Sequence, residues 1–325
     1  MTAIEYLRNL QKNYRLKPEF AEVMKKLAYR RQEQLGFSYE DIKDYLSTLT
    51  TLEGQENWFR ETIVLPLISA LPDNNKNLVR DIYIGFLPTH NPNAFAISAP
   101  NNEPIVVVHT SLIGSISFYN ELQFISGKVM LNDINEGVDY LNKGLKHVLN
   151  SFVQDYFYEF PLLPLNLSKQ EQILVEMKTL AQETFIVAHE LAHICLGHLN
   201  SCLNEPLFFN REDLLVRKFN RDQQMEFEAD VLAVKWLSLL KQKQDDMITQ
   251  TFGSFFISFA LEVFMLFHII EVNFGIPKDT SSHPPAVSRL NYILNNCSTI
   301  MSEGDREFVK EMISNALDIE SFKIK

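Results

Sequence analysis

Cysteine is scarce in this chain of 325 residues, which contains only Cys195, Cys202 and Cys297. Three unpatterned cysteines are too few for a disulfide framework, and an odd number fits a reducing compartment better than secretion. The first twenty residues mix charged and apolar side chains and lack the continuous apolar core of a signal peptide. We therefore expect a cytoplasmic protein that folds without covalent cross-links.

Positive charge is also in short supply. The chain has 30 Lys and Arg residues against 41 Asp and Glu residues, which gives a formal net charge of −11. Proteins that bind nucleic acid concentrate Lys and Arg to neutralise phosphates, so nucleic acid is not an expected partner. The one basic stretch, residues 25–31, has the spacing of a solvated helix face. Internal repeats and low-complexity tracts are absent, which argues against a solenoid or a disordered scaffold.

Turn signals and apolar periodicity divide the chain into two regions. From residue 1 to about residue 72, apolar positions recur at helical spacing. The turn-rich cluster at residues 72–75 ends this pattern. We expect a helical N-terminal region over residues 1–75 and a second domain over residues 76–325.

Short β-rich segments open the second region. They occupy residues 82–86, 93–98 and 105–108. Pro92 and Pro100 flank the second segment, and proline suits an edge strand because it cannot donate to the hydrogen-bond ladder. We expect a small sheet with residues 93–98 at its edge.

Two long helices are predicted farther along the chain. Ser168 and Glu171 have the spacing of a capping box, and the helix that they open should run to about Gly197. A second helix is expected over residues 222–240, with Glu226 and other acidic side chains on its polar face.

Residues 252–270 form a very apolar segment. Nineteen residues barely span a bilayer, and the carboxylate of Glu262 near the middle would be costly in lipid. We expect a buried core helix, and membrane association of this segment is the open alternative.

The sequence His-Glu-Leu-Ala-His at residues 189–193 carries the main chemical signal. On a helix, His189 and His193 lie one turn apart on the same face and can share one metal ion. Glu190 lies beside them, where it can act as a general base on water without binding the metal. The pentapeptide predicts a hydrolytic zinc site, although it is also compatible with two satisfied core histidines and a surface glutamate.

Such a site needs a third ligand. His198 follows His193 by five residues, about 140° around an ideal helix, so it can join only if the helix ends at Gly197. Glu226 and Asp230, one turn apart on the second helix, are better placed. Glu226 would complete the ligand set, and Asp230 would accept a hydrogen bond from a ligand imidazole. The alternative for this pair is an ordinary exposed acidic face.

Taken together, the motifs resemble gluzincin peptidases of the HtpX and CAAX-prenyl-protease type. These enzymes pair a His-Glu-x-x-His helix with a downstream Glu-x-x-x-Asp helix, as at residues 189–193 and 226–230 here. Residues 282–285, Ser-His-Pro-Pro, with the trailing Arg289 are similar to the family's His-Pro-Pro segment and its arginine. The resemblance implies that His283 stabilises the oxyanion and that Arg289 braces the carboxylates of the site or donates to the oxyanion.

A looser resemblance concerns Asn93, Ala94, Phe95 and Ala96, which are similar to the family's Asn-Ala-Phe strand. An extended substrate could add itself to such an edge by main-chain hydrogen bonds. The resemblance covers about residues 80–295 and implies an α+β fold. That fold is a mainly helical zincin-like metallopeptidase domain with a small edge-stranded β-sheet and one zinc ion per chain.

These features predict a zinc-dependent endopeptidase that acts on a protein or peptide. Regulatory or defence peptidases with one dedicated protein target remain within this prediction. A zinc-stabilised regulatory or binding protein is the alternative from another class, but a structural site prefers four closed ligands and does not need Glu190. A separate thiolate site at Cys195, His198 and Cys202 is a further alternative, with poor spacing for zinc.

Overall fold

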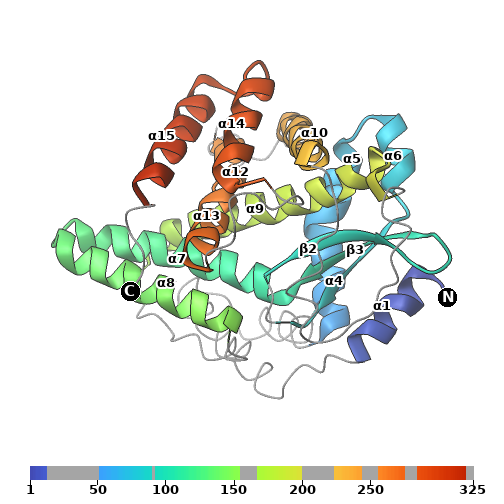
Figure 1. Ribbon diagram of the computed structural model, residues 1–325, viewed down its shortest axis with the longest axis horizontal. Helices are drawn as coiled ribbons and strands as arrows, with labels where there is room; N and C mark the ends of the chain where they lie inside the picture. The colour runs from blue at the N-terminus through green and yellow to red at the C-terminus, as the bar shows by residue number, and fades with distance from the viewer. Residues whose placement is uncertain are drawn as a thin grey trace.

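The computed structural model describes residues 1–12, 51–89, 92–153, 167–199, 223–243, 255–274 and 284–319. Within these ranges the protein is mainly helical with one small sheet, as the predicted α+β class requires (Figure 1). The described helices are α1 (Ala3–Lys12), α4 (Leu52–Phe59), the π-helical turn η1 (Arg60–Val64), α5 (Leu65–Ala70), α6 (Asp73–Val79), α7 (Thr110–Met130), α8 (Ile134–Val153), α9 (Lys169–Cys195), α10 (Gln223–Lys243), α12 (Phe256–Leu261), α13 (Val263–Phe274), α14 (Ala286–Cys297) and α15 (Glu303–Ile319). The strands are β1 (Tyr83–Leu87), β2 (Ala94–Ser98) and β3 (Pro104–His109).

The described sheet has the order β1-β3-β2 and is mixed. β1 runs parallel to β3, and β2 runs antiparallel to it. All three strands match predicted segments, and β2 lies at one end of this sheet, as expected for residues 93–98.

The two faces of the sheet pack against different parts of the chain, because side chains alternate between faces along a strand. Ala96 and Val106 belong to the main hydrophobic core, which also contains much of α9. Phe95 and Val107 point the other way, into a smaller cluster completed by Leu7 of α1. Figure 1 shows α1 on the side of the sheet away from α9. The strands therefore form a layer between α1 and the long central helix.

The helices that precede residue 75 contribute to the main core. Phe59 and Leu67 lie in the same cluster as Trp236 of α10. The π-helical turn precedes Pro66, whose missing N–H removes one helical hydrogen bond, and the Leu65 N–H donates to the Arg60 carbonyl five residues earlier. The predicted domain boundary at residue 75 stays a prediction, and the helical pattern predicted over residues 13–50 lies outside the described residues.

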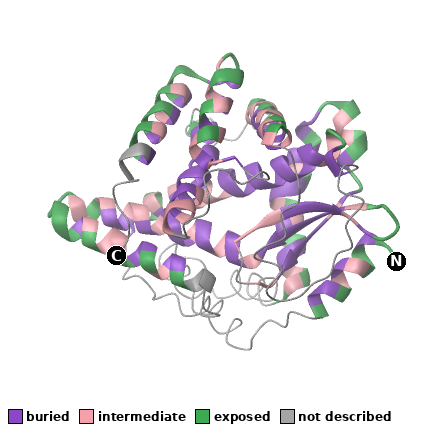
Figure 2. Ribbon diagram, viewed as in Figure 1, coloured by how far each residue is buried: buried purple, intermediate pink, exposed green. Residues whose placement is uncertain are grey.

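Helix α9 begins as the sequence predicts. The Ser168 hydroxyl accepts a hydrogen bond from the Glu171 N–H (3.3 Å), and the Glu171 carboxylate accepts one from the Ser168 N–H (2.6 Å). The second half of α9 is almost wholly buried (Figure 2). Helix α10, predicted over residues 222–240, packs closely along α9. The two helices that carry the predicted ligands are therefore neighbours.

The apolar segment forms two helices, α12 and α13, which meet at Glu262. The Glu262 carboxylate pairs with the Lys178 Nζ atom of α9 at 2.7 Å, and both side chains are nearly buried. By length and composition Phe256–Asn273 is able to cross a membrane, and 61% of this stretch is buried inside the protein. The stretch is therefore mostly enclosed by the protein, but it forms two helices in place of the single core helix that the sequence predicts.

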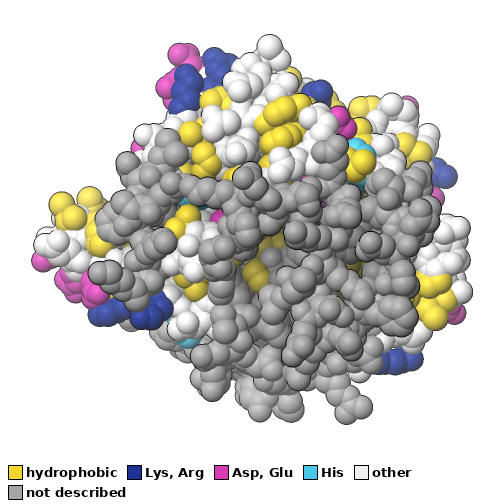
Figure 3. Space-filling model, in the orientation of Figure 1, with side chains coloured by type: hydrophobic (Ala, Val, Ile, Leu, Met, Phe, Trp, Pro, Cys, Tyr) yellow, Lys and Arg dark blue, Asp and Glu magenta, His cyan; other side chains and the backbone are white. Residues whose placement is uncertain are grey.

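Helices α7 and α8 form a long hairpin that projects from the body of the protein (Figure 1). Hydrophobic side chains gather near its far end (Figure 3). In the turn, Leu131 is 88% exposed, and Ile134 at the start of α8 is 70% exposed. Close packing of the two helices depends on Gly144, where an added Cβ would overlap the Leu122 side chain.

Candidate metal centre

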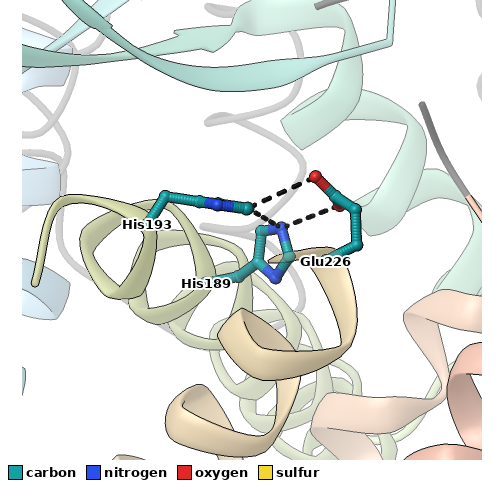
Figure 4. Close-up of side chains that lie close together, drawn as sticks. All are labelled: His189, His193 and Glu226. Carbon is teal, nitrogen blue, oxygen red and sulfur yellow. Dashed lines mark hydrogen bonds and ion pairs between the residues drawn. The ribbon is translucent and has the colours of Figure 1, made fainter. Parts of the chain in front are cut away.

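Three side chains from two helices meet in the core. His189 and His193 project from α9, and Glu226 projects from α10 (Figure 4). The two Nε2 atoms are 3.1 Å apart. The Glu226 Oε2 atom lies 3.4 Å from His189 Nε2, and Oε1 lies 3.4 Å from His193 Nε2. All three residues are buried. Two motifs that are far apart in the sequence therefore bring their side chains together in one compact group.

The donor atoms of this group fit a transition-metal ion. Zinc bonds of about 2.0–2.1 Å in tetrahedral geometry need donor atoms about 3.3 Å apart. The two Nε2 atoms are close to this separation, and each lies at a similar distance from one of the two Glu226 oxygens. Imidazole nitrogen with carboxylate oxygen is a donor set that suits zinc. Two imidazole nitrogens and a buried carboxylate this close together need a cation among them, either a bound metal ion or a proton on one of the rings. His189, His193 and Glu226 therefore form a plausible three-ligand site.

A carboxylate orients the first histidine. The Asp230 Oδ1 atom lies 2.9 Å from His189 Nδ1, on the side of the ring away from Nε2. If Nδ1–H donates to Asp230, the Nε2 lone pair faces Glu226 and His193. Burial opposes the charged form of His189, but Asp230 and then Glu226 outweigh this effect and raise the pKa to about 9. Asp230 thus contacts the ring nitrogen opposite Nε2, and its supporting role stays a prediction.

Arg289 of α14 completes the polar cluster. Its Nε and Nη2 atoms donate to the two Asp230 carboxylate oxygens at 2.7 and 2.6 Å, and Nη1 lies 3.7 Å from Glu226 Oε2. Burial alone would raise the pKa of Asp230, but Arg289 and then His189 lower it, so the carboxylate stays ionised. The guanidinium also lies 4.8 Å from the centre of the Phe264 ring. Arg289 therefore contacts both carboxylates, and its bracing role stays a prediction.

Glu190 occupies the position expected of a base beside the ligands. Its Oε1 atom is 4.0 Å from His189 Nε2, and the residue is 5% exposed. The side chain therefore lies beside the three-ligand group without belonging to it. Its catalytic role stays a prediction.

His198 lies outside the described ligand group. Helix α9 ends at Cys195, and Gly197 has a positive φ of 73°, a conformation that favours glycine. The chain turns back there, and His198 Nδ1 lies 2.8 Å from His193 Nδ1. The ring thus contacts His193 on the side opposite Glu226. The spacing of residues on an ideal helix did not predict this contact, because it places His198 on a different face from His193.

The remaining predicted residues fall in different places. His283 and Cys202 lie outside the described residues. In β2, which packs against α9, Ala94 and Ala96 face the main core, and Phe95 faces the α1 side, where its ring contacts His109. Asn93 precedes β2, and its side chain accepts a hydrogen bond from the Ala94 N–H.

Comparison with known proteins adds one match. The family model for Peptidase U49 matches residues 159–312, a segment that includes α9, α10 and α14. The small sheet precedes this segment. No curated protein and no solved structure matches the chain. Over the part of the chain that carries the candidate metal centre, the protein is similar to a peptidase family, which supports peptidase activity.

Proposed function

We propose that the protein is a zinc-dependent endopeptidase of the gluzincin type. The observation that carries this proposal is the group of His189, His193 and Glu226, whose potential ligand atoms lie within 4.8 Å of one another, inside the segment that matches a peptidase family. A binding protein stabilised by zinc would not need Glu190 beside three ligands, and the family match favours the enzyme. We also propose that it acts in the cytoplasm on a protein or peptide.

Each described residue of the centre has a separate task in this proposal. His189, His193 and Glu226 would hold zinc, which when bound supplies a Lewis acid that polarises a peptide carbonyl and acidifies water. Glu190 takes a proton from the attacking water and delivers it to the leaving amine. Its position beside the ligands supports this role.

The surrounding residues keep the centre in position. Asp230 holds His189 through Nδ1, and Arg289 balances the charge of Asp230 within the core. Because the Arg289 guanidinium donates to both carboxylate oxygens of Asp230, we propose a bracing role for Arg289. His283 is the proposed donor to the oxyanion, as the resemblance implies.

An extended substrate is proposed to pair with the strand that includes Ala94–Ala96. This strand ends the described sheet and packs against α9, the helix that carries the catalytic motif. Main-chain pairing would align the peptide along the site, and side-chain pockets would choose the cleavage position.

The first test compares zinc content and hydrolysis in matched variants. Glu190→Gln should retain one zinc per chain by elemental mass spectrometry and lose cleavage of a fluorogenic peptide library. His193→Ala and Glu226→Ala should lose the metal and some thermal stability, because metal binding is coupled to folding. Glu307→Gln, on the exposed face of α15, is the control and should behave as wild type.

The outcomes separate the parts of the proposal. Wild-type protein that neither contains nor takes up zinc would refute the metal centre. Unchanged zinc affinity in Glu226→Ala would refute the assignment of the third ligand. Full cleavage by Glu190→Gln would refute its role as the base. Zinc without cleavage of any peptide or protein tested would favour the binding-protein alternative.

A further inference from the structure

We infer that His198 is a positioning residue that fixes the tautomer of His193, and that Glu228 sets the direction of this hydrogen bond. The inference rests on the proposed function, since it assigns a task to residues around the proposed metal centre. Neither residue is a ligand in the described group.

The geometry of the contact is specific. His198 is 6% exposed and His193 is fully buried, with their Nδ1 atoms 2.8 Å apart. The ring centres are 5.0 Å apart and the ring planes are inclined by 62°. Gly197, in its left-handed conformation, returns the chain so that a residue beyond the helix reaches a residue within it. A surface histidine would not need this enclosure.

Two nitrogen atoms at this distance must share one proton between them, so one donates and the other accepts. The group that contacts Nε2 of His198 determines which of the two Nδ1 atoms donates. Its Nε2 atom lies 3.5 Å from Glu228 Oε2, and a carboxylate favours N–H over a lone pair at that position. A neutral His198 with Nε2–H has its lone pair on Nδ1, so His193 Nδ1–H is the donor.

The state of His193 at its metal-facing nitrogen follows directly. A neutral imidazole that is protonated at Nδ1 has a lone pair at Nε2. His193 Nε2 is the atom that lies 3.4 Å from Glu226. His198 thereby prepares His193 as a ligand, as second partners of ligand histidines do in metal proteins.

Both ligand histidines then depend on the same neighbouring helix. Asp230 holds His189 directly, and Glu228 acts on His193 through His198. Glu228 lies on a different face of α10 from Glu226 and Asp230, and it contributes because His198 lies beyond the end of α9. Helix α10 therefore supplies one ligand and supports both others.

Three substitutions at residue 198 distinguish positioning from packing. Asparagine places its side-chain oxygen the same number of bonds from Cβ as the imidazole Nδ1 atom, so His198→Asn keeps an acceptor for His193. Glutamine extends one bond farther, and alanine removes the acceptor. Loss of such a partner typically weakens metal affinity 10–100-fold. Glu228→Gln should have a smaller effect, because its contact is longer and its side chain is 46% exposed.

The experiment measures zinc affinity of the full chain by competition with a chromophoric chelator. We expect affinity about 10–100-fold weaker for His198→Ala and His198→Gln, and a value much closer to wild type for His198→Asn. The absorption spectrum of the cobalt-substituted protein should follow the same order. Thermal unfolding of the metal-free variants measures any packing effect separately.

Two results would overturn the inference while leaving the proposed function intact. One is zinc affinity within twofold of wild type for all three variants at residue 198. The other is an equal loss of affinity in all three, including asparagine, that tracks the stability of the metal-free protein. A wild-type chain that binds no zinc would instead refute the proposed metal centre itself.

Discussion

Replacing Arg289 by methionine is expected to destabilise the metal-free protein by about 3–5 kcal/mol, because Asp230 would lose its fixed positive partner in the core. Asp230 is fully buried, and both of its oxygens accept hydrogen bonds from the guanidinium, at 2.6 and 2.7 Å. Methionine preserves the unbranched apolar stem of arginine and lacks the guanidinium group that lies over Phe264. The substitution therefore removes charge and hydrogen bonds more than packing.

The magnitude follows from the contacts that are lost. Two hydrogen bonds between charged groups contribute about 1.5–3 kcal/mol each, and the cation–π contact with Phe264 contributes about 1–2 kcal/mol. Part of this is offset because Arg289 no longer has to be desolvated, and because His189 remains 2.9 Å from Asp230. A net loss near the middle of the range for broken buried ion pairs is therefore expected.

Urea unfolding with excess chelator provides the assay, since Trp236 on α10 is 1% exposed and its emission should report loss of the core around the site. Asp230→Asn and the double variant complete a thermodynamic cycle. We expect the double variant to be less destabilised than the sum of the two single variants by about 1–3 kcal/mol. A loss below about 1 kcal/mol in Arg289→Met, with no coupling to Asp230, would refute this account of the buried pair.

Three further predictions concern stability away from the ligands, each measured by thermal or urea unfolding. Ser168→Ala should cost about 1 kcal/mol by removing the cap of α9, and Ser168→Asp should retain most of that stability. Gly144→Ala should cost about 1–3 kcal/mol through overlap with Leu122, and Leu122→Ala should reduce the penalty of the glycine substitution in the double variant. Lys178→Met should cost about 3–5 kcal/mol because Glu262 would remain buried without its partner, and adding Glu262→Leu should recover part of that loss.

Each of these predictions has a contrary result. Equal losses in both variants of Ser168 would contradict the capping argument. A Gly144→Ala penalty that persists unchanged in the Leu122→Ala background would place the clash elsewhere. If the changes in the free energy of unfolding caused by the Lys178 and Glu262 substitutions were additive, the two charges would not interact across α9 and α12.

The sequence was most informative where local chemistry and periodicity dominate. Ser168 with Glu171 located the start of α9, because a capping box satisfies two helix-end N–H groups through residues close in sequence. Likewise, the spacing within residues 189–193 placed two imidazoles on one helix face without reference to the rest of the chain. The contact with Glu226 followed from the chemical demand for a third ligand.

Other features depend on contacts that spacing does not encode. An ideal helix extended past Gly197 puts His198 away from the site, whereas the observed turn brings it to His193. The break at Glu262 within the apolar segment coincides with its pairing to Lys178, 84 positions earlier in the sequence. A local chain reversal produces the first contact, and the break at Glu262 accompanies a partner distant in sequence. Residue spacing alone gives little information about either.

The position of Arg289 has a consequence for the order in which the protein is made. Helix α10, which carries Asp230, leaves the ribosome before α14, so Asp230 cannot be enclosed with its guanidinium partner until residues around 289 have been synthesised. The proposed hydrolytic centre is therefore expected to close late, when the helices near the C-terminus dock. A nascent chain that carries only the His-Glu-Leu-Ala-His helix would lack both Glu226 and the pair of Asp230 and Arg289, and with them the proposed centre.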